Sequence, residues 1–446
     1  MLTLGITAFH GPSAVCLVRD GRVIAAVRED RLSRRPLDAR FPAESVAYCL
    51  RAGKIGATSL DAIAVSGSDA VPPTAAGSLE GADLASSSWH RPWTRLFRKR
   101  PRLADWIARE IDPSVPVRFV ERARAHAWAA LAESPFEAAT IAVWEPGLAC
   151  VARSRGGRIE SCDIRAVEGS AIRFVSDVAA EVRAASPADP IVVTGSSIRG
   201  ADVAAALRDT AAPAPWWIHP ACGGGADAIG AAWCVAAESD AMEAGGGRTS
   251  AGVGPGYNRH QIRTLLRSRG VVPTEIERDE APERAAQALA EGSRVGWFQG
   301  RMDFSDDTLI SRSIVSMPAP GAAGFLLVAR ERADHVIDLG DRWHAPFAWG
   351  VPRAEWRDRF GLDASPCPVY AVERERARAM HRLLDLVAEK TGAPFLISEA
   401  LCTDDTPSAC TPGDAYDAFL ARGLDLLLME NCAVGAAVLA AKTASP

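Results

Sequence analysis

Residues 2–27 read LTLGITAFHGPSAVCLVRDGRVIAAV, and this stretch predicts how the chain begins to fold. It contains three short runs of apolar and β-branched residues, which is the composition of strands. The runs are Leu2 to Ile6, Ser13 to Val18 and Arg22 to Val27. The pair Asp20-Gly21 favours a tight turn between the second and third runs. We therefore expect an antiparallel three-stranded meander at the N-terminus.

A second meander is expected further along the chain. A helix over 43–52 and a strand over 62–66 follow the first meander, and a helix over 123–131 precedes the second. The later strands and helix are Ala139 to Trp144, Leu148 to Arg153, Arg158 to Cys162, Ile191 to Thr194 and the helix Ala201 to Leu207. This repeated order is expected of the actin- and hexokinase-type fold, in which two ribonuclease-H-like halves enclose a nucleotide cleft.

The chain from Glu283 onward predicts a second α/β unit. Its helices and strands alternate, and a linker around 273–282 precedes it. The expected elements are a helix to Ala290, strands over 294–298 and 325–328, a helix over 374–390, a strand over 394–397, a helix over 412–422 and a strand over 424–428. The fold class is therefore α/β with two domains.

Composition limits the possible functions. The chain has 446 residues, 48% of them hydrophobic and 24% charged, with a net charge of -5, and this balance does not indicate a nucleic-acid or anionic-membrane partner. We expect the basic run over 95–102 to be a solvated helix face or loop. No apolar run reaches the roughly 20 residues of a membrane span, and no leader peptide is evident. The ten cysteines form no CxxC pair, which favours reduced thiols in a cytoplasmic protein.

The stretch VGWFQGRMDF, residues 295–304, indicates a strand that runs into a turn at Gly300. Arg301 follows the turn, and Arg312 and Ser313 lie shortly after it. Two guanidinium groups near a glycine turn suit a phosphate or carboxylate, because arginine binds such groups with two parallel hydrogen bonds. A surface turn with solvated charges is the alternative explanation.

Several stretches of the chain, in the same order, resemble the nodulation-type O-carbamoyltransferases. At the N-terminus they are Leu4 to Gly11, Ser13-Ala14, Asp20 to Ala26 and Glu29 to Arg34. The strand and turn over Gly296 to Ile314 are also similar to a motif of that family. Further matches are Ser134 to Ala139, Pro220-Ala221, Ala228 to Ala232 and Thr411 to Ala415.

The resemblance implies a fold and an activity. Residues 1–270 would form the actin-like domain, and residues 280–446 the smaller YrdC-like domain. In the family the YrdC-like domain is understood to make carbamoyl adenylate from ATP and carbamoyl phosphate. The actin-like domain then transfers the carbamoyl group to a hydroxyl, using a metal ion and a bound nucleotide. Gly223, Gly225 and Asp227 are expected at the nucleotide.

The metal ligands of that family are only partly present here. They should be two histidines spaced as H-x-x-x-H and two aspartates, and the corresponding positions are Arg122, His126, Glu145 and Gly224. A fixed cation at Arg122 cannot ligate a metal, and one histidine with one carboxylate is a poor ligand set. A bound divalent metal is therefore not expected. His126 is then a polar helix residue, or a base or hydrogen-bond donor to a ligand.

Positive charge is also missing from the second domain. Asp307 replaces a family arginine, and the runs over 345–349 and 398–402 depart from the family pattern. Arg301, Arg312 and Ser313 remain as candidates for binding a phosphate or carboxylate. His10 is the best remaining candidate, with His126, for contacting the transferred group or the acceptor. Its alternative role is to cap the end of a strand.

Two functions stay open at this point. The first is a divergent transferase that moves a carbamoyl or related acyl group onto a small molecule in biosynthesis, with ATP and carbamoyl phosphate as possible cosubstrates. The second is an inactive relative that binds a ligand or serves as the partner subunit of an active paralogue. A homodimer, or a heterodimer with such a paralogue, is compatible with either function.

Overall fold

The structure, a computed structural model, describes residues 1–9, 11–69, 103–166, 169–198, 200–211, 214–220, 225–239, 252–305, 307–322, 324–338 and 347–435. Its contacts divide the chain into two compact units. One comprises Met1–Val167 and Gly223–Thr249, and the other comprises Glu168–Cys222 and Ser250–Pro446. The expected domain boundary between residues 270 and 280 stays a prediction. The basic run over 95–102 lies outside the described residues.

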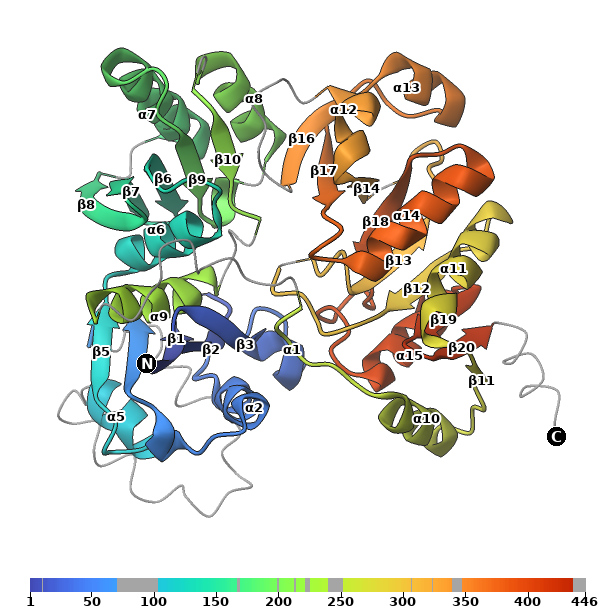
Figure 1. Cartoon of the computed structure of the whole chain (residues 1–446), viewed down its shortest axis with the longest axis horizontal. Coiled ribbons are helices and arrows are strands. Elements are labelled where there is room, and N and C mark those ends of the chain that lie inside the picture. The colour runs from blue at the N-terminus through green and yellow to red at the C-terminus, as the bar shows by residue number, and fades with distance from the viewer. Residues whose placement is uncertain are drawn as a thin grey trace. The chain divides into compact units, whose positions relative to one another are not determined.

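The N-terminal meander is present as expected. β1 (Leu2–Thr7), β2 (Ala14–Arg19) and β3 (Arg22–Arg28) pair antiparallel in succession. Asp20 and Gly21 have φ angles of 50° and 77°, the left-handed backbone of a tight hairpin turn. β4 (Ala62–Ser66) and β5 (Val117–Val120) extend the sheet in parallel, giving the order β3-β2-β1-β4-β5 (Figure 1).

Helices cover both faces of this sheet, because the strands are apolar on both sides. The helical segments of the first unit are α1 (Glu29–Ser33), α2 (Ala43–Gly53), the 3-10 turn η1 (Ala57–Ser59), α5 (Leu103–Glu110), α6 (Arg122–Glu133) and α9 (Ala226–Glu238). Leu4 and Ile6 belong to the core cluster that includes residues of α2 and α5. α9 packs on β1, β2 and β4, and α6 packs on α9. A Cβ on Gly230 would lie 1.7 Å from the Ala125 carbonyl oxygen, so glycine permits this close helix contact.

A second sheet repeats the architecture of the first. β6 (Ala139–Glu145), β7 (Leu148–Arg155) and β8 (Arg158–Arg165) form an antiparallel meander, and β9 (Ile191–Thr194) pairs in parallel with β10 (Trp216–Ile218). The strand order is β10-β9-β6-β7-β8. Read from each meander, both sheets have the order third, second, first, fourth, fifth. The duplicated ribonuclease-H-like fold class is therefore confirmed by strand order alone.

The second unit contributes α7 (Ala171–Ala185), η3 (Ser196–Ile198) and α8 (Ala201–Thr210), which pack together near β9. The sequence analysis did not identify α7. Its N-terminus is capped by the Ser170 hydroxyl, which accepts a hydrogen bond from the Arg173 backbone N–H. α7 buries Phe174, Val175 and Val178 along one face. This spacing is that of an amphipathic helix and was visible in the sequence.

A ten-stranded mixed sheet forms the C-terminal part of the second unit, in the order β11-β20-β19-β12-β13-β18-β14-β17-β16-β15. Its strands are β11 (Thr274–Glu275), β12 (Val295–Phe298), β13 (Arg312–Ser316), β14 (Phe325–Ala329), β15 (Ile337–Asp338), β16 (Phe347–Pro352), β17 (Cys367–Val372), β18 (Phe395–Ala400), β19 (Leu426–Met429) and β20 (Cys432–Gly435). Its helical segments are α10 (Arg259–Ser268), η4 (Arg278–Glu280), α11 (Ala281–Ala290), η5 (Arg330–Arg332), α12 (Ala333–Val336), α13 (Ala354–Phe360), α14 (Arg378–Thr391) and α15 (Pro412–Ala421).

Adjacent residues of β12 face opposite sides of this sheet. Trp297 lies in a core cluster with residues of α11 and α14, which lie side by side in Figure 1. Phe298 lies in another core cluster, with residues of α10 and α15. The predicted α/β unit is therefore present. The helix predicted over 374–390 begins only at Arg378. Among the described residues, no helix combines the length and apolar character that a membrane span needs.

Candidate functional site

A buried carboxylate lies at the N-terminal end of α9. Asp227 is 3% exposed, and its Oδ2 accepts hydrogen bonds from Thr7 Oγ1 at 2.9 Å and Ser66 Oγ at 2.7 Å. Thr7 is the last residue of β1 and Ser66 the last residue of β4, two parallel neighbours in the first sheet. The carboxyl ends of such strands are the usual place for ligands in α/β folds.

The charge of Asp227 is balanced by groups from three elements, α6, β1 and β4. Burial alone would raise the pKa of Asp227, because a carboxylate is poorly solvated inside a protein. The charges of His126 and Arg122, together with the Ser66 and Thr7 hydroxyls, outweigh burial and hold the pKa below its ordinary value. Asp227 is therefore an anion at neutral pH. Its position in the first turn of α9 suits an anion, because the helix dipole is positive there.

α6 supplies the cationic side of this site. His126 is 1% exposed, and both of its ring nitrogens are buried without a hydrogen-bond partner. Its Nε2 lies 3.8 Å from Glu145 Oε1, which is beyond hydrogen-bonding distance. Arg122 lies four residues before His126, and residues at this spacing share one helix face. The charges of Arg122 and His126 both act on Asp227, so three of the expected positions belong to one site.

These residues do not form a ligand set for a metal ion. Within the part of the chain that the structure describes, one group places three possible ligand atoms within 4.8 Å of one another, and it is Glu331, His381 and Asp385. His126, Glu145 and Asp227 are not in it. Arg122, the family's first ligand position, adds a positive charge that would repel a cation. The predicted loss of the family's metal site agrees with the chemistry of these donors and stays a prediction.

The glycine turn before α9 is only partly described. His10, Gly223 and Gly224 lie outside the described residues, and their predicted roles stay predictions. Gly225 is the N-cap of α9 with a φ of 107°, a backbone conformation that favours glycine. The expected nucleotide contact of Gly225 and Asp227 also stays a prediction.

Arg312, in β13, is a fully buried arginine, and nearly all of its N–H donors form hydrogen bonds within the protein. Its Nη1 donates to the carbonyl oxygens of Gln299 (3.0 Å) and Ser311 (2.7 Å). Its Nη2 donates to those of Pro255 and Gly300, both at 2.9 Å. Its guanidinium carbon lies 3.7 Å from the centroid of the Phe298 ring, and burial lowers its pKa to about 10. Only Nε lacks a hydrogen-bond partner. A phosphate contact of Arg312, which the sequence predicts, would have to use this atom.

Arg301 differs from Arg312 and Ser313 in exposure. Arg301 is exposed and donates from Nε to the Gly254 carbonyl oxygen at 3.0 Å. Ser313 is fully buried in β13, and its hydroxyl has no hydrogen-bond partner. Gly254 lies against this turn, since a Cβ there would be 2.9 Å from the Met302 carbonyl oxygen. The described glycines of this segment thus permit close backbone approach.

The sequence analysis gave no role to a carboxylate in the same turn. Asp303 is fully buried, and its carboxylate accepts hydrogen bonds from the Ser305 hydroxyl at 2.7 Å and from the Ser311 hydroxyl and backbone N–H. Burial raises the pKa of Asp303 despite these bonds. The serines at 305 and 311, which follow Asp303 closely in the sequence, were the available signal for this hydrogen-bonded turn. Asp303 holds the turn that carries Arg301.

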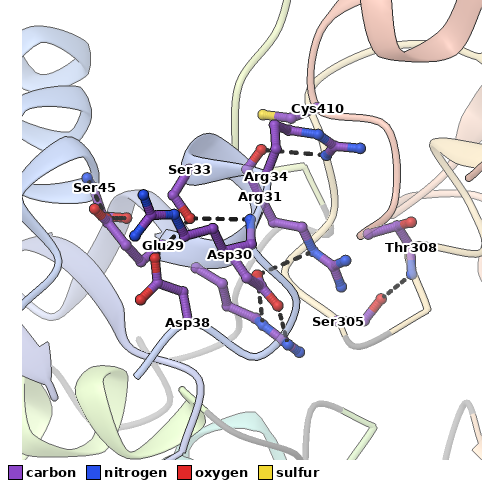
Figure 2. Close-up of polar contacts among 12 residues, drawn as sticks. Glu29, Asp30, Arg31, Ser33, Arg34, Asp38, Ser45, Ser305, Thr308 and Cys410 are labelled. Carbon is purple, nitrogen blue, oxygen red and sulfur yellow. Dashed lines mark hydrogen bonds and ion pairs between the residues drawn. The ribbon is translucent and has the colours of Figure 1, made fainter. Parts of the chain in front are cut away.

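Sequence analysis also missed the role of a buried ionic cluster in α1, drawn in Figure 2. Asp30 accepts hydrogen bonds from Arg28 Nε at 3.2 Å and Arg28 Nη2 at 2.6 Å, and Arg31 Nε lies 3.7 Å from it. Glu29 caps α2 by accepting from the Ser45 hydroxyl at 2.7 Å and the Ser45 backbone N–H at 2.9 Å. Burial raises the pKa of Glu29. These residues explain why a short, charged helix can follow the first meander.

Comparison with known proteins finds one family at both ends of the chain. Residues 2–76 match the model of the carbamoyltransferase N-terminus, and residues 362–435 match the model of the carbamoyltransferase C-terminus. The nodulation protein NolNO of Sinorhizobium fredii is 24% identical, and the comparison covers 100% of this chain and 81% of that protein. These matches support a divergent member of the carbamoyltransferase family, a carbamoyltransferase-like transferase, as the resemblance of the motifs indicated.

The chain is also similar to other proteins. The uncharacterized protein sll1178 of Synechocystis is 22% identical over 99% of this chain and 97% of its own length. The solved ROK hexokinase of Thermus thermophilus is 15% identical and covers 54% of this chain, with a TM-score of 0.33. A TM-score at this level is too low to assign a fold. The fold is assigned from the strand order.

Proposed function

We propose that this carbamoyltransferase-family protein transfers a carbamoyl or related acyl group to the hydroxyl of a small biosynthetic molecule, and that a built-in arginine replaces the family's metal. ATP and carbamoyl phosphate are the proposed source of the transferred group. The observation that carries the proposal is the charge of Arg122 acting on buried Asp227 at the carboxyl ends of β1 and β4. A cation is thus part of the chain at the position where the relatives are expected to bind one.

Arg122 and His126 supply the groups that this transfer needs. The acceptor hydroxyl attacks the carbamoyl carbon, its proton must be removed, and the phosphate or adenylate leaves. A guanidinium can stabilise the negative charge that develops on the carbonyl oxygen. Both ring nitrogens of His126 lack a hydrogen-bond partner, and in the neutral form of the imidazole one of them can accept the proton of the hydroxyl. Asp227 holds Arg122 and His126 in position through its charge.

The test is a direct assay of the donor half-reaction. The purified chain is mixed with carbamoyl phosphate and the Mg²⁺ complex of ATP, and the release of pyrophosphate and phosphate is measured. The assay is repeated with a chelator that removes transition metals while the Mg²⁺ bound to ATP is kept. We expect His126→Gln to release pyrophosphate and phosphate as the wild type does. We expect the same variant to transfer the carbamoyl group to an acceptor about 100-fold more slowly or worse. His381→Gln, a buried histidine of the second unit, is the matched control. Loss of transfer to the acceptor on removing a transition metal would overturn the proposal.

The hydrogen bonding of Arg312 favours a second candidate function. All four Nη hydrogens of this arginine are directed to backbone carbonyls, which supports a structural role in place of phosphate binding. In that case the chain is a non-catalytic relative that binds a ligand or an active paralogue. The absence of pyrophosphate release, together with co-purification of the chain with a catalytically active paralogue, would support this second function and exclude the first.

A further inference from the structure

We propose that Cys150 and Cys162 are a modification site, a dithiol that hydrogen peroxide oxidises reversibly to a disulfide. Their Sγ atoms lie 2.9 Å apart in the first unit. The sequence analysis regarded the ten cysteines as isolated thiols because the two residues are separated by eleven others. This inference is independent of the proposed carbamoyl transfer.

Strand pairing brings the two thiols together. Cys150 lies in β7 opposite Ile164, and Cys162 lies in β8 opposite Ala152. The two cysteines are therefore diagonal neighbours on one face of the hairpin, a spacing at which side chains can meet. A disulfide requires the sulfurs to approach to about 2.05 Å. Closing the remaining gap takes less than about one ångström, which small side-chain rotations can supply.

The two thiols differ in exposure and charge. Cys162 is partly exposed and Cys150 is buried. The hydrogen bond from Cys150 lowers the pKa of Cys162 and outweighs the opposing effects of burial and of the charge of Glu121. The same hydrogen bond and burial raise the pKa of Cys150. Cys162 is therefore the more reactive thiolate, since the thiolate is the nucleophile.

The reaction can be written with balanced atoms and electrons. The Cys162 thiolate attacks one oxygen of hydrogen peroxide, the O–O bond breaks, and Cys162 becomes a sulfenic acid while hydroxide leaves. The Cys150 sulfur then attacks the sulfenic sulfur, the S–O bond breaks, and the oxygen leaves with the Cys150 proton as water. In sum, two thiols are oxidised, one peroxide is reduced, and two water molecules form. Thiol exchange with a reductant reverses the step.

The experiment counts thiols in the full-length protein. After removal of reductant, the chain is treated with one equivalent of hydrogen peroxide, unfolded, titrated with a thiol reagent and mapped by mass spectrometry. We expect two thiols to disappear and one linked peptide pair to appear, joining Cys150 to Cys162. Dithiothreitol should restore both thiols.

Variants separate the two roles. Cys150→Ser should stop at the sulfenic acid, which dimedone then labels on Cys162, and Cys162→Ser should react at least ten-fold more slowly. Cys367→Ser, a partly buried thiol of the second unit, is the matched control and should behave as the wild type. A wild-type chain that keeps both thiols, forms links between chains, or binds stoichiometric zinc through the pair would overturn the proposal. These readouts on wild-type protein remain decisive even if a variant does not fold.

Discussion

Asp227 in the first unit and Arg312 in the second are both buried charged groups, and they are stabilised in different ways. Asp227 receives two hydroxyl hydrogen bonds and is balanced by charged side chains on α6. Arg312 donates four hydrogen bonds to backbone carbonyls and lies over an aromatic ring. The charge of Asp227 depends on other titratable groups, whereas Arg312 depends on the path of the backbone.

This difference separates a candidate site from a structural element. A carboxylate that is paired with cationic side chains can respond to a ligand, because those side chains can change partners. A guanidinium that holds the carbonyls of Pro255, Gln299, Gly300 and Ser311 fixes the shape of a turn. Residue type alone does not distinguish a ligand-binding charge from a structural one, because the sequence predicted phosphate binding equally for Arg301 and Arg312.

The largest expected effect follows from removing Arg312. Arg312→Met removes four hydrogen bonds to the backbone carbonyl oxygens of one turn, and we expect the free energy of unfolding to fall by about 3–5 kcal/mol. Arg301→Met is the matched control, since Arg301 is exposed, and it should cost about 1 kcal/mol. Urea unfolding measures both values. Equal losses in the two variants would remove the distinction between a structural and a surface arginine.

A smaller effect is expected at Asp227. Asp227→Asn keeps an acceptor for the hydroxyls but leaves the charges of Arg122 and His126 unbalanced, and we expect a loss of about 2 kcal/mol in unfolding free energy. Asp202→Asn, at an exposed position in α8, should change it by no more than about 0.5 kcal/mol. If Asp227→Asn is as mild as its control in the same urea titration, Asp227 is not the centre of a buried charged site.

The pH dependence of stability should distinguish the two groups further. The folded-state pKa of Asp227 lies below its ordinary value of 3.8, so its contribution to stability is present above that pH and is lost as the pH falls below it. Arg312, with a pKa lowered from 12.5 to about 10, stays protonated in both states between about pH 3 and pH 9 and contributes no slope there.

We therefore expect Asp227→Asn to flatten the acid limb of the stability profile and Arg312→Met to lower the whole profile in parallel. Some acid dependence should persist in Asp227→Asn. Asp38 has a pKa of about 2 because hydrogen bonds from Arg40 and Ser33 outweigh burial, and its contribution is lost between pH 3.8 and about pH 2. Unfolding at a series of pH values measures the slopes. A parallel shift in Asp227→Asn would contradict the assignment of its charge.

Much of the fold was predictable because local signals agreed with the final structure. The alternating strands, the Asp20-Gly21 turn and the strand over 62–66 were all predicted close to their observed bounds. The start of α14 was predicted four residues early, because the charged residues over 374–377 fit a helix as well as a turn. Local pattern does not decide such a boundary.

The candidate site was less predictable, because it depends on contacts between distant residues. Asp227 was recognised, but its partners Thr7 and Ser66 are separated from it by 220 and 161 positions. Arg312 has the sequence context of an anion-binding residue, and only the positions of the carbonyls around it indicate a structural role. The Cys150–Cys162 pair depends on the register of β7 and β8, which a sequence pattern does not specify.

The central claim is that Arg122 occupies, as a fixed cation, the position where the carbamoyltransferase family is expected to hold a metal. The most direct measurement is elemental analysis of the purified wild type, Arg122→His and Arg124→His, each after incubation with Fe²⁺ or Zn²⁺. The account predicts little metal in the wild type and in Arg124→His, and uptake of about one ion per chain by Arg122→His, which restores H-x-x-x-H spacing. A wild-type chain that holds about one ion, and loses it in His126→Ala, would contradict the claim.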